Sequence, residues 1–116
     1  MNNPESRLQQ ACVKWFRLQY PKLTIFAIPN GGNRDAITGA ILRAEGALAG
    51  VADLLLMRAS HGYHGLFIEM KSEKRKQTPS QREFEIRATV AGYRYKLCRS
   101  LDEFIEIVKN YLSLSL

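Results

Sequence analysis

The chain has 116 residues, enough for one domain around a single hydrophobic core and too few for two domains. Its hydrophobic fraction of 46% and its charged fraction of 24% are ordinary for a globular protein and argue against disorder. The net charge of +6 favours an anionic partner, with nucleic acid as the first candidate.

Membrane insertion and secretion are not expected. No apolar run approaches the ~20 residues that a membrane-spanning helix needs, and the polar start M-N-N-P-E-S is unlike a signal peptide. We therefore expect a cytoplasmic protein without a membrane partner. The two cysteines, Cys12 and Cys98, lie outside any metal-ligand spacing. We expect them to be reduced, half-buried packing residues.

The first predicted element is a helix that begins at Asn3 and ends before Pro21. Asn3 and Pro4 have the form of an N-cap and a first helical residue, and apolar residues then recur at helical spacing. Glu5 lies at the edge of this apolar stripe. It could reach a neighbouring sheet, or it could only complement the helix dipole, and the spacing alone favours the second interpretation.

A short strand is predicted from residue 23 to residue 28, and it leads into the loop P-N-G-G-N-R. Glycines let a backbone approach a phosphate closely, and Asn30 and Arg34 in this loop could bind one. A plain Gly-rich turn between two elements fits the same residues at least as well.

The second predicted helix covers residues 36–48. This stretch is Ala-rich, and its apolar residues form one stripe from which Arg43 is excluded. We expect the helix to end near Gly46 or Gly50 and to lead into the next strand.

A predicted β-hairpin carries the residues that matter most for function. Two apolar runs, 50–57 and 66–71, are joined by a polar turn that contains glycine. Side chains alternate between the faces of a strand, so Glu69 and Lys71 point the same way. Asp53 is a carboxylate among apolar neighbours, where an unpaired charge is costly to bury. Two carboxylates and an ammonium on adjacent strands could hold a hard divalent cation with a water beside it.

A structural explanation of the same three residues stays open. Glu69 and Lys71 could form an ion pair at the end of a strand, and Asp53 could be a turn residue. The pattern D…E-x-K occurs in many unrelated sequences, so these three letters alone favour the structural explanation. His61 and His64 lie in the hairpin turn, and we assign them no role.

The second half of the chain predicts a charged loop, two helices and a strand. The loop, residues 72–77, is basic and follows the hairpin directly, so it is either solvated or in contact with phosphate. A helix begins at Thr78, which forms a capping-box pattern with Gln81, and Gln81 also lies on the inward stripe of that helix. A strand over residues 93–98 and a helix over residues 100–112 follow.

The predicted order is helix, strand, helix, hairpin, helix, strand, helix. This order is typical of an α/β sandwich around a mixed sheet of about four strands. We expect residues 1–116 to form a single domain.

Together these motifs resemble the VRR-NUC family of the PD-(D/E)XK nuclease superfamily, in its stand-alone form carried by bacteria and phages. The matching stretches are E-S-R-L-Q-Q, P-N-G-G-N-R, A-E-G-A-L-A-G-V-A-D-L-L-L, G-Y-H-G-L-F-I-E-M-K, S-Q-R-E-F and A-G-Y-R. One departure is Ala52, which stands where the superfamily has Pro before the catalytic Asp; Pro sets only the local backbone there. The resemblance implies a restriction-endonuclease-like fold and a place in the cytoplasm of a bacterial cell or a phage-infected host.

The resemblance also implies a metal site. Asp53 and Glu69 would bind Mg²⁺ or Mn²⁺, with the backbone carbonyl of Met70 as a further ligand. Glu5 would complete the metal shell from the first helix, directly or through water.

Further roles implied by the resemblance concern the substrate. Lys71 would position or activate the attacking water or stabilise charge on the phosphate, and Gln81 would orient Lys71 or the scissile phosphate. The catalytic set is then Asp53, Glu69, Lys71 and Gln81. The candidate DNA contacts are Asn30, Arg34, Arg43, Lys74, Arg75 and Lys76.

The activity implied by the resemblance is metal-dependent hydrolysis of DNA, selective for branched structures such as four-way (Holliday) junctions. Paired cuts in a four-way junction favour a two-fold homodimer, for which residues 36–48 and the leucines of residues 112–116 offer apolar surface. The alternative is a DNA-binding module without catalysis on a nuclease-like fold. Intact Asp53, Glu69 and Lys71 argue against it, since a binder gains nothing from acids that face phosphate.

Overall fold

The computed structural model describes residues 3–29 and 35–113. Their helices and strands follow in the predicted order: α1 (Pro4–Gln19), β1 (Ile25–Ala27), α2 (Ala36–Ala44), β2 (Leu54–Leu56), β3 (Leu66–Met70), α3 (Pro79–Val90), β4 (Arg94–Cys98) and α4 (Leu101–Leu112). Within these ranges, none of the helices is long and apolar enough to cross a bilayer.

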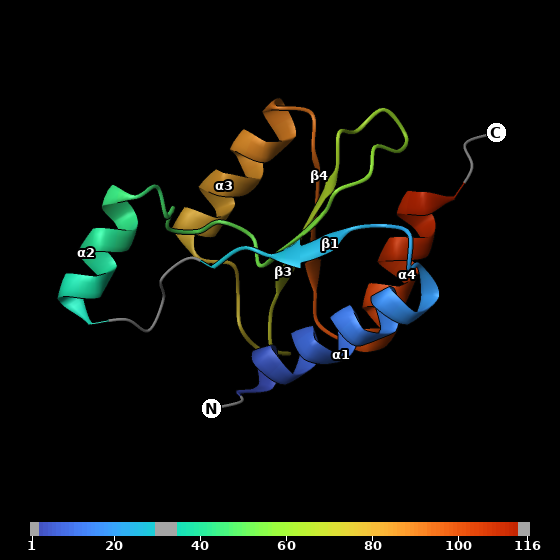
Figure 1. The fold of residues 1–116 in the computed structure, drawn as a ribbon, viewed down its shortest axis with the longest axis horizontal. Coiled ribbons are helices and arrows are strands. Elements are labelled where there is room, and N and C mark those ends of the chain that lie inside the picture. Colours follow the sequence, from blue (N-terminus) through green and yellow to red (C-terminus); the bar gives the residue numbers. More distant parts are fainter. Residues whose placement is uncertain (1–2, 30–34, 114–116) are drawn as a thin grey trace.

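The strands form one mixed sheet in the spatial order β1-β2-β3-β4. β1 pairs antiparallel with β2, and β2 pairs antiparallel with β3, which confirms the predicted hairpin. β3 and β4 are parallel, so the chain must cross over between them, and α3 lies on this crossover (Figure 1). The fold is α/β, with a four-stranded mixed sheet flanked by helices, as the sequence predicts.

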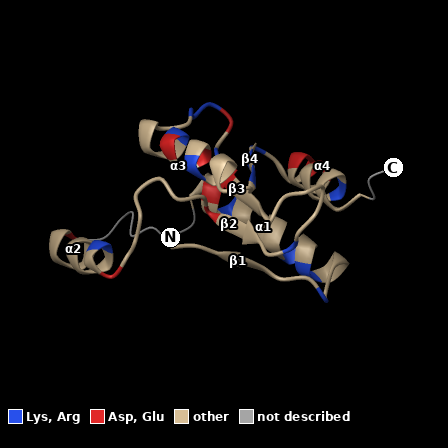
Figure 2. Ribbon diagram, turned by 90° about the horizontal axis from the view of Figure 1, so that it is seen from above, with Lys and Arg blue, Asp and Glu red and all other residues tan. Residues whose placement is uncertain are grey.

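α2 stands apart from the rest of the molecule, as both the front view (Figure 1) and the view from above (Figure 2) show. Ile37 and Ile41 on its apolar stripe are 75% and 53% exposed. The helix ends at Ala44, near the first of the two predicted ends, because Gly46 takes a left-handed conformation with φ of 112°. The apolar side of α2 is therefore left largely uncovered.

The two faces of the sheet meet different helices. Ile68 on β3 points into the hydrophobic core, which the sheet shares with α1 and α4. Its neighbour Phe67 points the other way and contacts Phe84 of α3, with ring centroids 5.0 Å apart. Because side chains alternate along a strand, Glu69 belongs to the α3 face and Met70 to the core face.

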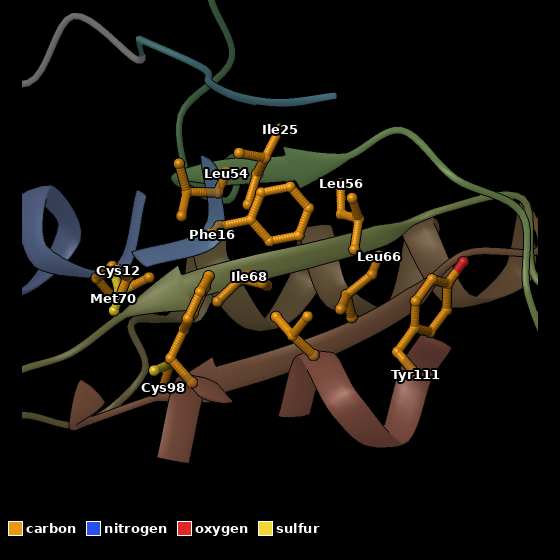
Figure 3. Packing of buried hydrophobic residues seen from close by; sticks show 12 residues of the cluster. Cys12, Phe16, Ile25, Leu54, Leu56, Leu66, Ile68, Met70, Cys98 and Tyr111 are labelled. Atoms are coloured by element: carbon orange, nitrogen blue, oxygen red, sulfur yellow. The ribbon is translucent and has the colours of Figure 1, made fainter. Parts of the chain in front are cut away.

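The core lies between the sheet and the pair α1 and α4, and Figure 3 shows the Phe16 ring of α1 beside the aliphatic side chains of β1 and β2. Each fully buried large apolar side chain stabilises the fold by about 1.5–3 kcal/mol. Cys12 and Cys98 are free and fully buried, not half-buried as predicted, because both belong to this cluster. Its members are Cys12, Phe16, Ile25, Leu54, Leu56, Leu66, Ile68, Met70, Cys98, Phe104, Val108 and Tyr111.

Candidate active site

Asp53 and Glu69 face each other at the end of the β2–β3 ladder. The register pairs Leu54 with Ile68, so one further step along the antiparallel strands sets Asp53 opposite Glu69. The Asp53 carboxylate also accepts a hydrogen bond from the Met70 backbone N–H at 2.7 Å. This bond extends the contact between the strands and fixes the carboxylate beside the end of β3.

Glu69 and Lys71 are the buried charged side chains of the described ranges, with 3% and 2% of their surface exposed. Gln81 Nε2 donates to Glu69 Oε2 at 2.9 Å, whereas Glu69 Oε1 is buried and has no hydrogen-bond partner among the described residues. A buried polar atom in that state costs about 1–3 kcal/mol. A group that binds Glu69 Oε1 would therefore stabilise the site.

Lys71 supplies the positive charge of the site. Its backbone N–H donates to the Cys98 carbonyl at 3.0 Å, which continues the β3–β4 pairing by one residue. Burial raises the pKa of both Asp53 and Glu69, and the nearby Lys71 ammonium opposes this rise. The charge therefore lies close enough to the carboxylates to act on both.

Burial and like charge control the protonation of the carboxyl pair. Burial, followed by the negative charge of Asp53, raises the pKa of Glu69 to about 9. Burial also raises the pKa of Asp53, and the hydrogen bond that its carboxylate accepts from the Met70 N–H opposes this rise. At neutral pH the metal-free pair therefore holds a proton. A cation bound by both carboxyl groups would displace that proton.

Gln81 forms the capping box of α3 and contacts Glu69 at the same time. Its Oε1 accepts from the Thr78 N–H at 2.9 Å, and Thr78 Oγ1 accepts from the Gln81 N–H at 3.2 Å. Since the box uses the amide oxygen, the amide NH₂ is directed at Glu69. The sequence predicts that Gln81 orients Lys71 or a phosphate; the side chain that its amide holds in this structure is Glu69.

Gly50 lets the loop before β2 pack directly on the start of α3. Its φ of 84° is in the left-handed region, and a Cβ at this position would lie 2.3 Å from the Ser80 carbonyl oxygen. A larger residue would push α3 away from the loop that leads to Asp53. Gly50 therefore helps to set the position of Asp53 relative to Gln81, a contact that nothing in the sequence reveals.

Glu5 lies near the carboxylate pair but is held by the loop after β3. Its Oε2 accepts from the Ser72 N–H at 3.0 Å and forms an ion pair with Arg75 at 3.4 Å. Glu5 lines a cavity of about 610 Å³ together with Asp53 and Met70. In the part of the chain that the structure describes, no three acidic, His or Cys side chains lie close enough to hold a metal together. The structure thus places Glu5 beside the pair, and its role as a metal ligand, directly or through water, stays a prediction.

Arg99 shapes the loop after β3. Its Nη1 donates to the backbone carbonyls of Ser72 at 2.9 Å, Glu73 at 3.4 Å and Arg75 at 2.7 Å. Its own backbone N–H donates to Glu103 Oε1 at 2.7 Å, in the first turn of α4. One arginine thus ties the basic loop to α4. The sequence does not predict this role, because every residue has a backbone carbonyl and the pattern of side chains does not show which carbonyls Arg99 contacts.

The oxygen donors fit a hard divalent cation. Asp53 and Glu69 present carboxylates from facing strands, and within residues 3–29 and 35–113 the buried Glu69 Oε1 has no hydrogen-bond partner. Mg²⁺ is usually held in proteins by one or two carboxylates, with waters and substrate phosphates as its other ligands. Two carboxylates meet this requirement, and Glu5, the predicted third acid, is close enough to raise the pKa of both members of the pair.

A family model matches most of the chain. It is the model of the VRR-NUC domain, and the match runs from residue 3 to residue 102. The chain belongs to the VRR-NUC family. This is a nuclease-type family, and the matched range contains the carboxylate pair, Lys71, Gln81 and Arg99.

Two solved structures share the VRR-NUC fold seen here. One, described as a VRR_NUC domain protein, has a TM-score of 0.77 at 24% sequence identity, and the match covers 97% of this chain and 90% of the other. The second, described as a VRR_NUC domain, has a TM-score of 0.63 at 18% identity, and covers 95% of this chain and 99% of the other. Among curated proteins no match is found.

The predicted DNA contacts of this VRR-NUC protein are spread over the molecule. Lys74, Arg75 and Lys76 are exposed on the loop beside Glu5. Arg43 is exposed on α2, which stands apart from the acidic pair (Figure 1). Asn30 and Arg34 lie outside the described residues. The structure thus brings part of the set together, on the loop after β3.

Proposed function

We propose that this VRR-NUC protein is a Mg²⁺- or Mn²⁺-dependent DNA endonuclease that cleaves branched DNA, with four-way junctions as its substrate. The observation that carries the proposal is the Asp53–Glu69 pair, in which a buried carboxylate oxygen beside a buried lysine has no hydrogen-bond partner in the described part of the chain. Such a pair destabilises the metal-free protein. Strongly perturbed groups of this kind concentrate at functional sites.

Each residue of the site then has a distinct task. Asp53 and Glu69 hold the cation, which when bound supplies Lewis-acid chemistry to the phosphodiester. Lys71 places a positive charge where negative charge builds on the phosphate, and its burial limits screening by water. Gln81 holds Glu69 in a fixed orientation through its amide. Glu5 adds negative charge from α1 beside the pair.

The charge distribution supports DNA as the substrate. The chain carries a net charge of +6 although acids gather at the site. Lys74, Arg75 and Lys76 are exposed directly after the strand that carries Glu69 and Lys71. From this loop they can neutralise phosphates that flank the one being cut.

Cleavage of a panel of labelled substrates tests the function. Linear, flapped, forked and four-way DNA are incubated with Mg²⁺, Mn²⁺, Ca²⁺ or excess chelator. We expect cuts in the four-way junction with Mg²⁺ or Mn²⁺, binding without cuts in Ca²⁺, and no cuts with chelator. Cleavage in excess chelator would refute the mechanism.

Two glutamate variants make the test specific to the site. Glu69→Gln keeps the shape of the side chain but removes a carboxylate that would hold the cation, so the variant should bind DNA without cutting it. Glu83→Gln makes the same change at an exposed glutamate of α3, and this variant should behave as the wild type. A wild type that binds DNA tightly and cuts none of the substrates with any metal would support the alternative, a DNA-binding module without catalysis.

We further propose that the working unit is a homodimer with α2 in its interface. Resolving a four-way junction needs two cuts related by the junction's two-fold axis, which a two-fold pair of identical sites can make. Ile37 and Ile41 leave an apolar stripe exposed on α2, and such a stripe is normally buried against another element. The other predicted contact, the tail of residues 112–116, lies largely outside the described residues.

Light scattering at micromolar concentration tests the dimer. We expect a mass of twice the 13.2 kDa of one chain. Ile41→Asp should shift the mass towards that of one chain, whereas Val90→Asp, at an exposed position of α3, should leave it unchanged. A wild type with the mass of one chain that still makes efficient paired cuts would rule the dimer out.

A further inference from the structure

The cavity that contains Asp53 and Met70 continues as a groove along α1. The residues of α1 that line it run from Glu5 to Arg17 at spacings of three or four, which places them on one side of the helix. Ala27 at the end of β1 lines the same cavity, and β1 is an edge strand of the sheet. The groove therefore runs between the helix and the open edge of the sheet.

The two ends of this groove carry opposite charges. Glu5 and Asp53 lie at one end, and Lys14 and Arg17 line the other, where Figure 2 shows basic residues on α1. Arg17 Nη2 is fixed by a hydrogen bond to the Ile25 carbonyl at 3.2 Å. Lys14 is exposed, and it forms no ion pair with any residue of the described ranges. Its ammonium is therefore available to an anionic ligand.

The length and lining of the groove suit a nucleic-acid backbone. The stretch of about 12 residues from Glu5 to Arg17 spans about 18 Å of helix, or about five nucleotides at the rise of one DNA strand. Between the charged ends, α1 lines the groove with three polar side chains and one apolar side chain, those of Ser6, Gln9, Gln10 and Val13. Hydroxyl and amide groups commonly donate hydrogen bonds to phosphate and sugar oxygens.

We propose that this groove binds the sugar–phosphate backbone of the strand being cut, on one side of the scissile phosphate, with Lys14 as a direct phosphate contact. The inference rests on the proposed function, because that function identifies the ligand as DNA. The charge, length and position of the groove are the evidence that the strand lies along α1. A strand that lies against Lys14 and Arg17 leads along α1 to Asp53. The basic end thus attracts the strand, and the acidic end receives the phosphate that reacts.

A scan with uncharged phosphate analogues tests the contact. Four-way junctions that carry a single methylphosphonate, moved one position at a time, are titrated with protein in Ca²⁺ at several salt concentrations. The wild type should lose affinity about 10-fold at one or two positions on one side of the junction branch point. Lys14→Ala should be insensitive at those positions, and its slope of log affinity against log salt should be smaller by about 1.

Lys109→Ala is the matched control, because Lys109 is an exposed lysine on α4, outside the groove. It should keep both the position-specific sensitivity and the wild-type salt slope. A Lys14→Ala protein that keeps the wild-type sensitivity, or that matches Lys109→Ala, overturns the groove. So does a wild type that does not bind DNA.

Failure of the proposed function has a different signature. The same proteins are assayed with Mg²⁺ and Mn²⁺ on the unmodified junction. If the wild type cuts nothing while the Lys14 effect is present, the groove stands and the endonuclease activity does not. If the wild type cuts and Lys14→Ala is indistinguishable from Lys109→Ala, the activity stands and the groove does not.

Discussion

Two neighbouring regions of this VRR-NUC protein carry charged residues that differ in burial. At the ends of β2 and β3, Glu69 and Lys71 are buried, and Glu69 is held by a specific hydrogen bond from Gln81. In the loop that follows, Lys74 and Lys76 are exposed to water. The first group lies in a fixed geometry, and the second is free to adjust to a ligand.

The difference in burial separates chemistry from attraction. A buried charge acts strongly on the atoms beside it, because little water screens the field. An exposed charge is screened over about 10 Å at moderate salt, yet several of them together attract a long polyanion. The buried region is therefore suited to one reacting phosphate, and the exposed region to the flanking ones.

The largest expected effect is loss of cleavage in the buried region. Asp53→Ala, Glu69→Ala and Lys71→Ala should each reduce the single-turnover cleavage rate by about 10³-fold or more, because the first two remove a carboxylate that would hold the cation and the third removes the positive charge beside the reacting phosphate. Double variants should be little slower than the single ones, since the residues act as a unit. DNA affinity in Ca²⁺ should stay within about threefold of the wild type.

An acid from an exposed position provides the control for these variants. Asp102→Ala removes a carboxylate from the start of α4 and should cleave at the wild-type rate. Circular dichroism should show the same fold in all the variants. Cleavage by Glu69→Ala within a few-fold of the wild type would contradict the assignment.

A smaller effect should appear in the stability of the metal-free protein. The pKa of Glu69 rises from 4.5 to about 9 on folding, so the folded state holds a proton that the unfolded state has lost between these values. The free energy of unfolding should therefore fall as pH rises from about 5 to about 9. Thermal melts in chelator across this range measure the effect.

Glu69→Gln sharpens this prediction because it removes the titrating group. At pH 8 without metal, it should be more stable than the wild type by about 1–2 kcal/mol, or about 5–10 °C in Tm. Saturating Mg²⁺ should stabilise the wild type and not the variant. A wild type whose metal-free stability rises between pH 5 and pH 9 is incompatible with a protonated carboxyl pair.

The exposed region should affect binding and not chemistry. Lys74→Ala/Lys76→Ala removes two exposed charges and leaves the Glu5–Arg75 pair intact. We expect about a 10-fold loss of DNA affinity at moderate salt and a salt slope smaller by about 2. The cleavage rate at saturating DNA should remain within about twofold of the wild type. A slower chemical step at saturation would show that these lysines reach the reacting phosphate.

Much of the fold and the central part of the candidate site could be predicted from the sequence. Apolar periodicity and cap residues are local signals, and they predict every helix and strand in the observed order. The hairpin pattern predicts Asp53 and Glu69 on adjacent strands, and the capping box locates Gln81 at the start of α3. These features depend on residues that are close along the chain.

The features that the sequence did not reveal depend on contacts through space. The groove along α1 forms only when the helix lies beside β1, so Lys14 carries no signal of its own. In the sequence, Gly50 indicates the end of a helix. In the structure, the position excludes a larger residue because a Cβ there would clash with the Ser80 carbonyl. The bonds from Arg99 end on backbone carbonyls, which any sequence in that loop would supply.

Arg99 connects the two regions, and the smallest predicted effect concerns it. Its Nη1 holds the carbonyls of Ser72 and Arg75, so it sets the shape of the loop that carries the exposed lysines and contacts Glu5. Arg99→Lys keeps the charge but replaces a planar donor by a shorter, point-like ammonium. We expect DNA affinity to fall by about threefold with an unchanged salt slope, because the loop is misplaced while no phosphate contact is lost. Arg87→Lys, on the exposed side of α3, should match the wild type in both measurements. If the salt slope of Arg99→Lys changes as well, Arg99 itself binds phosphate. Arg99 would then belong to the exposed region that attracts DNA, and its role would not be limited to shaping the loop.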